Sequence, residues 1–207
     1  GDELDRIIPL GLDADRLPAP DPKGARPVGV LGVGSLNDVK HYSRFVEVID
    51  RLDDCRRDLR AEIIGGGPNR EKLGRLIREK GLDDRIRLAG ALPREEVLRR
   101  MRRARILLHT ARYDAQPYVL LEALASGMHV VSTPVGYEGP SDRIHFSAST
   151  NGLAESLRTL LRKELPHEAV SVPTAAETVT QYLELYDLAP TESDSTAAPS
   201  GDPTVGS

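Results

Sequence analysis

The sequence predicts an α/β domain built on a doubly wound parallel sheet. Short apolar runs that end at glycine or at a polar loop recur along the chain, and each is followed by a segment whose apolar residues repeat at helical spacing. Only short loops separate these segments, which favours parallel strands with helices packed on both faces of one sheet. With 207 residues, 39% of them hydrophobic, the chain can bury a full core.

The elements can be placed in order along the chain. The first strand is expected at residues 28–33, an apolar run that ends beside glycine. A helix at residues 41–52 follows, and its inner stripe includes Phe45, Ile49 and Leu52. The later strands are predicted at residues 61–64, 86–89, 106–109, 129–132 and 144–147, and the later helices at residues 70–80, 94–103, 117–126, 152–163 and 175–188.

Three regions divide the chain. Residues 1–27 are expected to form a lead-in strand and an interdomain connector, because a short apolar stretch is followed by a Pro-rich one. Residues 28–188 hold the alternating strands and helices. Residues 189–207 are rich in Pro, Thr, Ser, Ala, Gly and Asp, so this tail has too little apolar content to fold and is predicted to be disordered.

Composition narrows the classes of function. A net charge of −4 argues against a nucleic-acid partner. The single cysteine, Cys55, excludes an internal disulfide framework, and the five histidines lack metal-ligand spacing, so no metal site is predicted. There is no apolar run of about 20 residues and no secretory leader. We therefore expect a soluble, cytoplasmic domain.

Polar and glycine-rich loops follow the predicted strands, and ligands bind at that edge of such a sheet. Ser35 and Lys40 follow the first strand, and Lys is a point charge suited to phosphate. Gly66 lies in the glycine run after the second strand, where the backbone can approach a ligand closely. Ala91 and Leu92 follow the third strand. Together with two nearby carboxylates, these loops predict a site for a nucleotide carrying a polyhydroxylated group.

A nicotinamide dinucleotide is the alternative that the first loop suggests. Gly32 and Gly34 match the start of a dinucleotide fingerprint, but the third glycine is missing. No acidic residue closes the second strand in the way that such a site requires. The sequence therefore disfavours this cofactor.

The two carboxylates are Asp114, in a polar loop, and Glu122, inside the apolar helix at residues 117–126. Glu122 lies near the positive start of that helix, where a carboxylate and free backbone N–H groups can together meet a sugar or a phosphate. On spacing alone, an ordinary exposed Glu with a capping Asp is the favoured interpretation. The buried face of this helix is predicted to consist of Tyr118, Leu121, Leu124 and Ala125.

Ordered motifs over residues 7–188 support a family resemblance. The chain resembles the C-terminal, donor-binding domain of retaining nucleotide-sugar glycosyltransferases with two Rossmann-like domains, the glycogen-synthase-like class of group 1 glycosyl transferases. The most specific match is a pair of carboxylates separated by seven residues, Asp114 and Glu122. The other matching stretches are residues 8–13, 63–73, 81–90 and 122–131.

The resemblance implies a role for each matching residue. Glu122 would hold the ribose hydroxyls of the donor nucleotide, and Asp114 would bond the donor sugar or support the developing oxocarbenium charge. Lys40, with Ser35 at the position of the family's arginine, would face the diphosphate leaving group. The class needs no metal, so no cofactor is implied. The backbone between the carboxylates would contact sugar and diphosphate, and the third loop would cradle the base: Gln116, Pro117, Tyr118 and Val119, and Ala91 and Leu92.

This chain departs from the family pattern at several points. Ser35 replaces a charged arginine, Asp114 is one methylene shorter than the usual residue, and Pro117 lacks an N–H. We expect the family's N-terminal acceptor-binding domain to lie outside this chain, and we therefore expect the isolated domain to be inactive and to need that domain in cis or in trans. Three hypotheses stay open. These are the donor half of a glycosyltransferase, a degenerate non-catalytic relative or partner subunit, and an unrelated protein that binds another phosphorylated ligand.

Arginines crowd the helix at residues 94–103 and the strand after it. A solvated face balanced by Glu95 and Glu96 is the simpler interpretation. The alternative is a peripheral contact of residues 94–105 with an anionic inner membrane face, which would suit a lipid acceptor.

Overall fold

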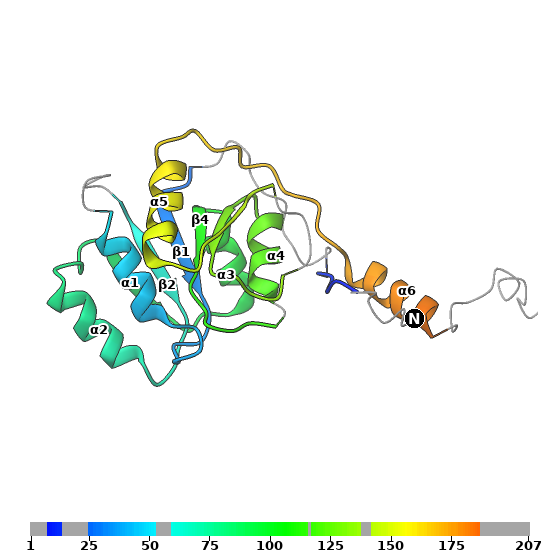
Figure 1. Ribbon diagram of the computed structural model, residues 1–207, viewed down its shortest axis with the longest axis horizontal. Helices are drawn as coiled ribbons and strands as arrows, with labels where there is room; N and C mark the ends of the chain where they lie inside the picture. The colour runs from blue at the N-terminus through cyan, green and yellow to red at the C-terminus, as the bar shows by residue number, and fades with distance from the viewer. Residues whose placement is uncertain (1–7, 14–24, 53–58, 116, 138–141, 187–207) are drawn as a thin grey trace, which may run out of the picture.

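The computed structural model describes residues 8–13, 25–52, 59–115, 117–137 and 142–186. This part of the chain holds six strands and six helices, coloured in chain order in Figure 1; they alternate as far as β5, after which β6, α5 and α6 follow. The strands are β1 (Val28–Val33), β2 (Ala61–Ile64), β3 (Ile86–Gly90), β4 (Ala104–His109), β5 (His129–Ser132) and β6 (Ile144–Phe146). The helices are α1 (Tyr42–Asp50), α2 (Arg70–Glu79), α3 (Arg94–Met101), α4 (Tyr118–Ala125), α5 (Thr150–Leu161) and α6 (Ala175–Leu185).

The strands form one sheet in the order β3-β2-β1-β4-β5-β6, and every neighbouring pair is parallel. The chain winds outward from β1 to β3, returns past β1, and winds the other way from β4 to β6. This is the predicted doubly wound sheet. Its switch point lies between β1 and β4, whose connections leave in opposite directions, and ligands favour the crevice at the carboxyl ends there.

Helices cover both faces of the sheet (Figure 1). The helices α1, α2 and α5 pack on one face, around the fully buried Phe45 and Leu157. The helices α3 and α4 pack on the other, around Met101 and Leu120. Side chains alternate along the central strands, so each strand feeds both cores: Val30, Ile106 and Leu108 point to the first face, and Leu31 and Leu107 to the second.

The elements predicted within residues 28–188 are all present, with half of their ends displaced by one to three residues. Helix α4 differs most from expectation. It begins at Tyr118, because Pro117 is the residue before the first turn and has an extended ψ of 81°. The predicted buried face was wrong at Tyr118, which is 46% exposed, and at Ala125, which is half-buried. The helix is rotated so that Leu120 and Ala123 are buried instead, beside Leu121 and Leu124.

Helix α6 stands away from the sheet and packs against the lead-in segment (Figure 1). The Leu12 N–H donates to the Pro173 carbonyl at 2.8 Å, and the Ala175 N–H donates to the Leu12 carbonyl at 2.9 Å. Gly11 lies so close that a Cβ there would be 1.9 Å from the Thr174 carbonyl oxygen. Within the helix only Thr178 is buried, and it donates to the Pro9 carbonyl. The predicted tail at residues 189–207 lies outside the described residues.

Candidate functional site

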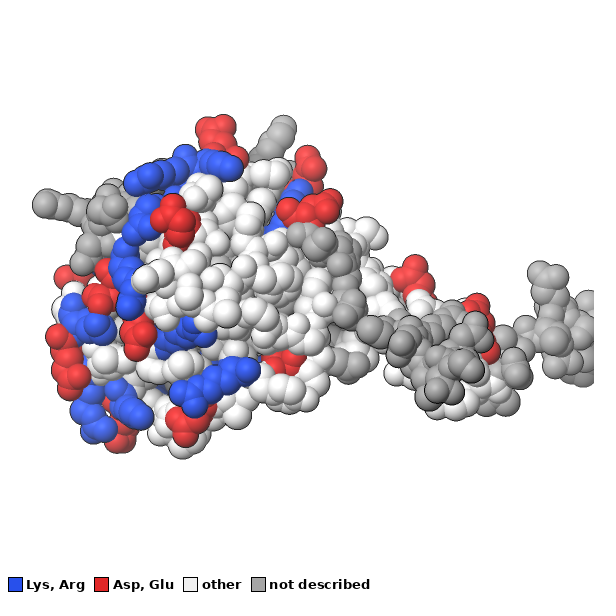
Figure 2. Space-filling model, viewed as in Figure 1, with Lys and Arg blue, Asp and Glu red and all other residues white. Residues whose placement is uncertain are grey.

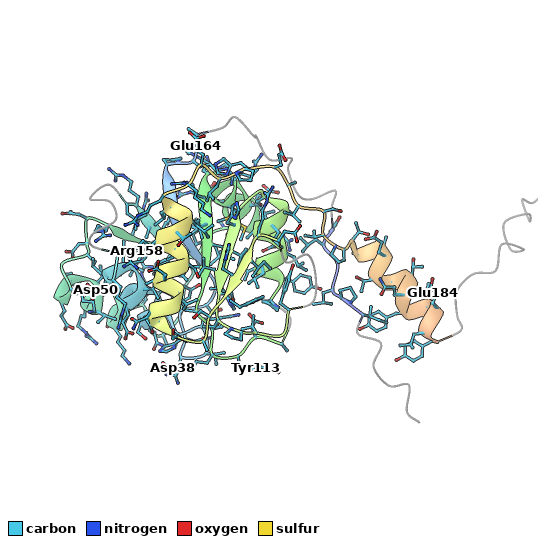
Figure 3. The ribbon with its side chains drawn as sticks, turned by 45° about the horizontal axis from the view of Figure 1, so that its top comes forward. Asp38, Asp50, Tyr113, Arg158, Glu164 and Glu184 are labelled. Carbon is cyan, nitrogen blue, oxygen red and sulfur yellow. The ribbon has the colours of Figure 1, made fainter. Side chains whose placement is uncertain are left out.

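The loops that follow β1, β2 and β3 are joined to each other by backbone hydrogen bonds. The Gly34 N–H donates to the Ile64 carbonyl at 3.0 Å, and the Leu36 N–H donates to the Gly66 carbonyl at 2.8 Å. The Gly65 N–H donates to the Gly90 carbonyl at 2.8 Å. These bonds hold the three loops as one continuous rim along the carboxyl edge. Asp38 and Tyr113, from the loops after β1 and β4, lie at this edge, opposite Glu164 (Figure 3).

Glycine is required where these loops touch. A Cβ on Gly65 would lie 1.9 Å from the Gly34 carbonyl oxygen, and Gly65 has a φ of +154° that side chains rarely adopt. Gly66 is exposed, and a Cβ there would lie 3.5 Å from the Ala91 side chain. The predicted ligand residues Gly66 and Ala91 are therefore neighbours. Leu92 is half-buried against the core that α3 and α4 share.

Lys40 and Asp114 meet across the switch point. The Lys40 ammonium donates to Asp114 Oδ2, and the two side chains are 25% and 16% exposed. The backbone holds them in register. Thr110 Oγ1 donates to the Lys40 carbonyl at 3.1 Å, and the Arg112 N–H donates to the Val39 carbonyl at 2.8 Å. The pairing joins the loop after β1 to the loop after β4 at the point where a ligand is expected.

His109 lies beneath this pair at the end of β4, as a packed strand-end residue. It is 5% exposed, its Nδ1 lies 3.1 Å from Ser132 Oγ, and its Nε2 lies 3.3 Å from Asp114 Oδ2. Burial, and next the charge of Lys40, lowers the pKa of His109 from 6.5 to about 4, although Asp114 acts in the opposite direction. The imidazole is therefore neutral at pH 7, and the charges at the switch point are those of Lys40 and Asp114.

Glu122 lies on α4 and forms an ion pair with Arg94, the first residue of α3. Arg94 Nη2 is 2.8 Å from Glu122 Oε1, and the Glu122 side chain is only 14% exposed. Burial raises the pKa of the Glu122 carboxyl, and the charge of Arg94 partly offsets that shift. The sequence placed Glu122 near a helix start but did not suggest Arg94 as its partner, because the two residues belong to different elements.

The start of α4 presents backbone donors. Pro117 is buried and provides no side-chain cap, and the first turn contains no acidic residue. The N–H groups of Tyr118 and Val119 therefore lack an intrahelical acceptor and are available to a ligand. Tyr118 is exposed and Val119 is half-buried. Gln116 lies outside the described residues.

The loop after β5 supports the Asp114 loop. The Gly136 N–H donates to the Asp114 carbonyl at 2.9 Å, and a Cβ on Gly136 would lie 2.4 Å from the Ala115 carbonyl oxygen. Ser35, in the loop after β1, is exposed at the same edge. The structure thus brings Ser35, Lys40 and Asp114 to the carboxyl edge around the switch point.

The arginines of α3 are largely engaged by carboxylates. Arg99 Nε donates to Glu96 at 2.6 Å, and Arg100 Nε donates to the same carboxylate at 2.7 Å. Arg100 also forms an ion pair at 2.5 Å with Glu62, whose carboxylate is buried in β2. Arg94 is used by Glu122. This agrees with the simpler interpretation of a balanced, solvated face, although Glu96 rather than Glu95 pairs with Arg99 and Arg100.

The described residues contain neither a metal-binding group of side chains nor a membrane-spanning helix. No group of three His, Cys, Asp or Glu side chains in that part of the chain could hold a metal ion. None of its helices is both long and apolar enough to cross a bilayer.

Comparison with known proteins identifies the family. A model of glycosyl transferases group 1 matches residues 15–145, which is more than half of the chain. The chain belongs to this family. It is 29% identical over 189 residues to the gpi3 subunit of phosphatidylinositol N-acetylglucosaminyltransferase from Schizosaccharomyces pombe. That match covers 88% of this chain but 41% of the relative, so the chain spans less than half of that relative's length.

Solved structures of other proteins share the fold. HepE of Anabaena, solved in complex with UDP and glucose, superimposes with a TM-score of 0.71 and 17% identity over 89% of this chain and 57% of that one. The C-terminal domain of a group 1 family glycosyl transferase, LpcC from Francisella tularensis, superimposes with a TM-score of 0.63 and 19% identity. That match covers 74% of this chain and 89% of that domain. The resemblance to group 1 glycosyl transferases and the Rossmann-like fold that it implied are both confirmed.

Proposed function

We propose that this glycosyltransferase-family domain binds a nucleotide-diphosphate sugar at its carboxyl edge and acts as the donor half of a retaining glycosyltransferase. An N-terminal acceptor-binding domain, in cis or in trans, would complete the enzyme. The observation that carries the proposal is the meeting of Lys40 and Asp114 at the switch point. Asp114 lies in the loop that leads into α4, the helix that carries Glu122. The UDP and glucose bound to the Anabaena relative are compatible with it.

Each charged group has a role in this proposal. Lys40 would turn from Asp114 to the diphosphate, where a cation neutralises charge that grows as the glycosyl bond breaks. The N–H groups at the start of α4 would assist it. Asp114, released from Lys40, would accept hydroxyls of the sugar or stabilise the oxocarbenium charge. Ser35 would contribute a hydroxyl donor beside the phosphates.

Glu122 would hold the ribose. A partly buried carboxylate beside a cation is a strong acceptor for two vicinal hydroxyls, because its hydrogen bonds are charge-assisted. Arg94 fixes the carboxylate in place and opposes the upward pKa shift that burial causes, so it favours the ionised form. Gly66, Ala91 and Leu92 would line the place of the base. Metal-independent binding stays a prediction of the family resemblance.

Calorimetric titration with UDP tests the proposal. Replacing Glu122 by Ala should weaken UDP binding about tenfold to a hundredfold, because a hydrogen bond to a charged group is worth about 1.5–3 kcal/mol. Lys40→Ala should weaken it by a similar factor. The matched controls are Glu155→Ala on α5 and Lys80→Ala after α2, which remove the same side-chain types far from the carboxyl edge.

Binding that is unchanged in both Glu122→Ala and Lys40→Ala, or no binding by the parent chain at millimolar UDP, would contradict the proposal. Retention of the anomeric configuration is tested separately. With a separately expressed N-terminal domain present, NMR of the product should show the donor's anomeric configuration.

A second candidate is a domain that binds the donor without catalysing transfer, as a partner subunit. Two features favour this candidate. Ser35 stands where the family has an arginine, and the charge of Lys40 is compensated by Asp114. Ser35→Arg distinguishes the two functions when the N-terminal domain is supplied. A rise in transfer rate with little change in UDP affinity indicates a weakened enzyme, whereas no transfer by either protein indicates a binding subunit.

A further inference from the structure

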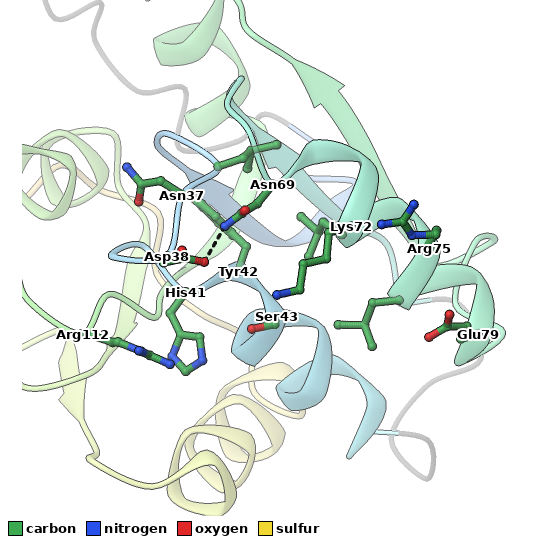
Figure 4. A pocket seen from close by; sticks show the side chains of 13 residues that line it. Asn37, Asp38, His41, Tyr42, Ser43, Asn69, Lys72, Arg75, Glu79 and Arg112 are labelled. Carbon is green, nitrogen blue, oxygen red and sulfur yellow. Dashed lines mark hydrogen bonds between the residues drawn. The ribbon is translucent and has the colours of Figure 1, made fainter.

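A second pocket lies beside the carboxyl edge, between the start of α1 and the outer face of α2. Its volume is about 290 Å³, near the lower end of ligand pockets in proteins. The buried side chains of Leu36, Tyr42 and Leu73 form an apolar base. Charged and polar side chains from the loop after β1, from α2 and from the loop after β4 surround it (Figure 4).

Three cations line this pocket from two separate parts of the chain. Lys72 and Arg75 come from α2, and Arg112 comes from the loop after β4. Lys72 points across the pocket toward Ser43, and Arg112 lies beside His41 (Figure 4). Within the described ranges, none of the three cationic groups has a hydrogen bond or an ion pair. This contrasts with Lys40, Arg94, Arg99 and Arg100, which all pair with carboxylates.

His41 lines the same pocket. Nδ1 of His41 is buried without a hydrogen-bond partner among the described residues. Burial, and next the charge of Arg112, lowers the pKa of His41, so its ring is held neutral beside the cations. His41 also has a φ of 51°, in the left-handed region that residues other than glycine rarely adopt. A buried polar atom without a partner, in a strained residue, is typical of a site that a ligand completes.

Two carboxylates, Asp38 and Glu79, complete the lining. Asp38 accepts a hydrogen bond from Asn69 Nδ2 at 2.8 Å, which fixes its orientation (Figure 4). With His41 neutral, three cations and two carboxylates give the pocket a net charge of +1. The cations suit a phosphate group, and carboxylate oxygens are acceptors for hydroxyls but not for phosphate oxygens.

We propose that this pocket binds a small soluble phosphomonoester of a polyol. The phosphate would lie between Lys72 and Arg112, and the hydroxyls would reach Asp38 (Figure 4). The site is distinct from the proposed donor site, although the two share one loop. Lys40 leaves this loop toward Asp114, whereas Asp38 and His41 line the pocket.

The probe for this site is sn-glycerol 3-phosphate, titrated into the full chain by calorimetry or followed by ligand-observed NMR. We expect one site per chain. Lys72→Ala and Arg112→Ala should each weaken it at least tenfold, because each removes an unpaired cation. Arg78→Ala, on the same helix but outside the pocket lining, is the matched control and should leave the affinity unchanged. All three side chains are exposed, so the variants should fold, which a thermal melt checks.

Two further experiments test the polyol assignment and whether the site is separate from the donor site. Glycerol should not bind, and inorganic phosphate should bind at least tenfold more weakly than the ester; equal affinities would overturn the polyol assignment. Saturating UDP should not displace the probe, and Glu122→Ala should leave probe binding intact even where UDP binding is lost. Displacement by UDP, or an affinity unaffected by Lys72→Ala and Arg112→Ala, would overturn the separate site.

Discussion

Charged side chains at the carboxyl edge form ion pairs, and a ligand must replace the partner in a pair in order to bind its charge. Lys40 is engaged by Asp114 and Arg94 by Glu122, in each case across two elements. Such pairs keep partly buried charges compensated while the site is empty, since a lone buried charge is costly. His109, neutral under Asp114, adds polarity without adding charge. The site is therefore neutral overall until a ligand separates the pairs.

His129 provides a prediction at this scale. It is 8% exposed at the start of β5, and neither ring nitrogen has a hydrogen-bond partner among the described residues. Burial, and next the charge of Arg143, lowers the pKa of His129 from 6.5 to about 4. A lowered folded-state pKa contributes stability that is present above pH 6.5 and is lost as the pH falls toward 4.

Replacing His129 by Leu should remove that part of the acid sensitivity. Between pH 7.5 and pH 5 the parent should lose about 2 kcal/mol of unfolding free energy more than His129→Leu does, because only the unfolded parent gains a proton there. Urea denaturation at the two pH values measures this. An equal loss in parent and His129→Leu would rule out the explanation.

At the scale of elements, the sheet edge is assembled by contacts between loops. The loops after β1, β2 and β3 touch through backbone atoms, so their mutual position depends on residues without side chains. Gly65 shows this most directly, because its Cβ would overlap the Gly34 carbonyl oxygen.

Gly65→Ala should therefore disturb the site through the loops. We expect a loss of about 1–3 kcal/mol of unfolding free energy from strain and overlap, and weaker UDP binding because the loop that carries Ser35 must move. Gly81→Ala is the matched control. Gly81 has a φ of +63° but no atom within 4 Å of its Cβ position, so that variant should lose stability through strain and keep its UDP affinity. Equal UDP affinities in Gly65→Ala and the parent would contradict the role of the loop.

Element type and order could be predicted from the sequence because apolar periodicity and glycine-ended runs are local patterns. The carboxyl edge followed from topology, so Lys40 and Asp114 could be placed at one edge in advance. The pairings could not be predicted. Whether Glu122 meets Arg94 depends on how α3 and α4 rotate on the sheet, and the error at Tyr118 has the same cause. The pocket with Lys72 and Arg112 has no local pattern at all.

At the scale of the whole molecule, a sheet covered on both faces is joined to a largely exposed helix, α6. Both faces of the sheet are covered, and β1 and β4 lie at its centre. Acidic and basic side chains alternate over the end that carries α1 and α2 (Figure 2). By contrast, α6 exposes Val179, Tyr182 and Leu185, Tyr186 just after it is exposed as well, and the helix is attached through the lead-in segment. An exposed apolar stripe of this kind suits contact with another domain.

Hydrogen exchange should report this inequality. Amides of β1 and β4 should exchange only through global unfolding, whereas those of α6 should exchange at a free energy several kcal/mol lower, because few buried contacts hold the helix. Thr174→Ala removes the capping box with Glu177 and should speed exchange in α6 alone. Ser149→Ala, which removes the cap of α5, is the control and should not affect α6. Protection of α6 equal to that of β1 would refute the picture.

The loop between β1 and α1 faces the proposed donor site on one side and the pocket on the other. Lys40 leaves it toward Asp114, and the strained His41 beside it turns toward the pocket with Lys72 and Arg112. A ligand on either side would act on the same few backbone torsions. Thermodynamic linkage then makes the effect reciprocal: whatever factor glycerol 3-phosphate imposes on UDP affinity, UDP must impose on glycerol 3-phosphate. Two ligands that never touch would each report the presence of the other.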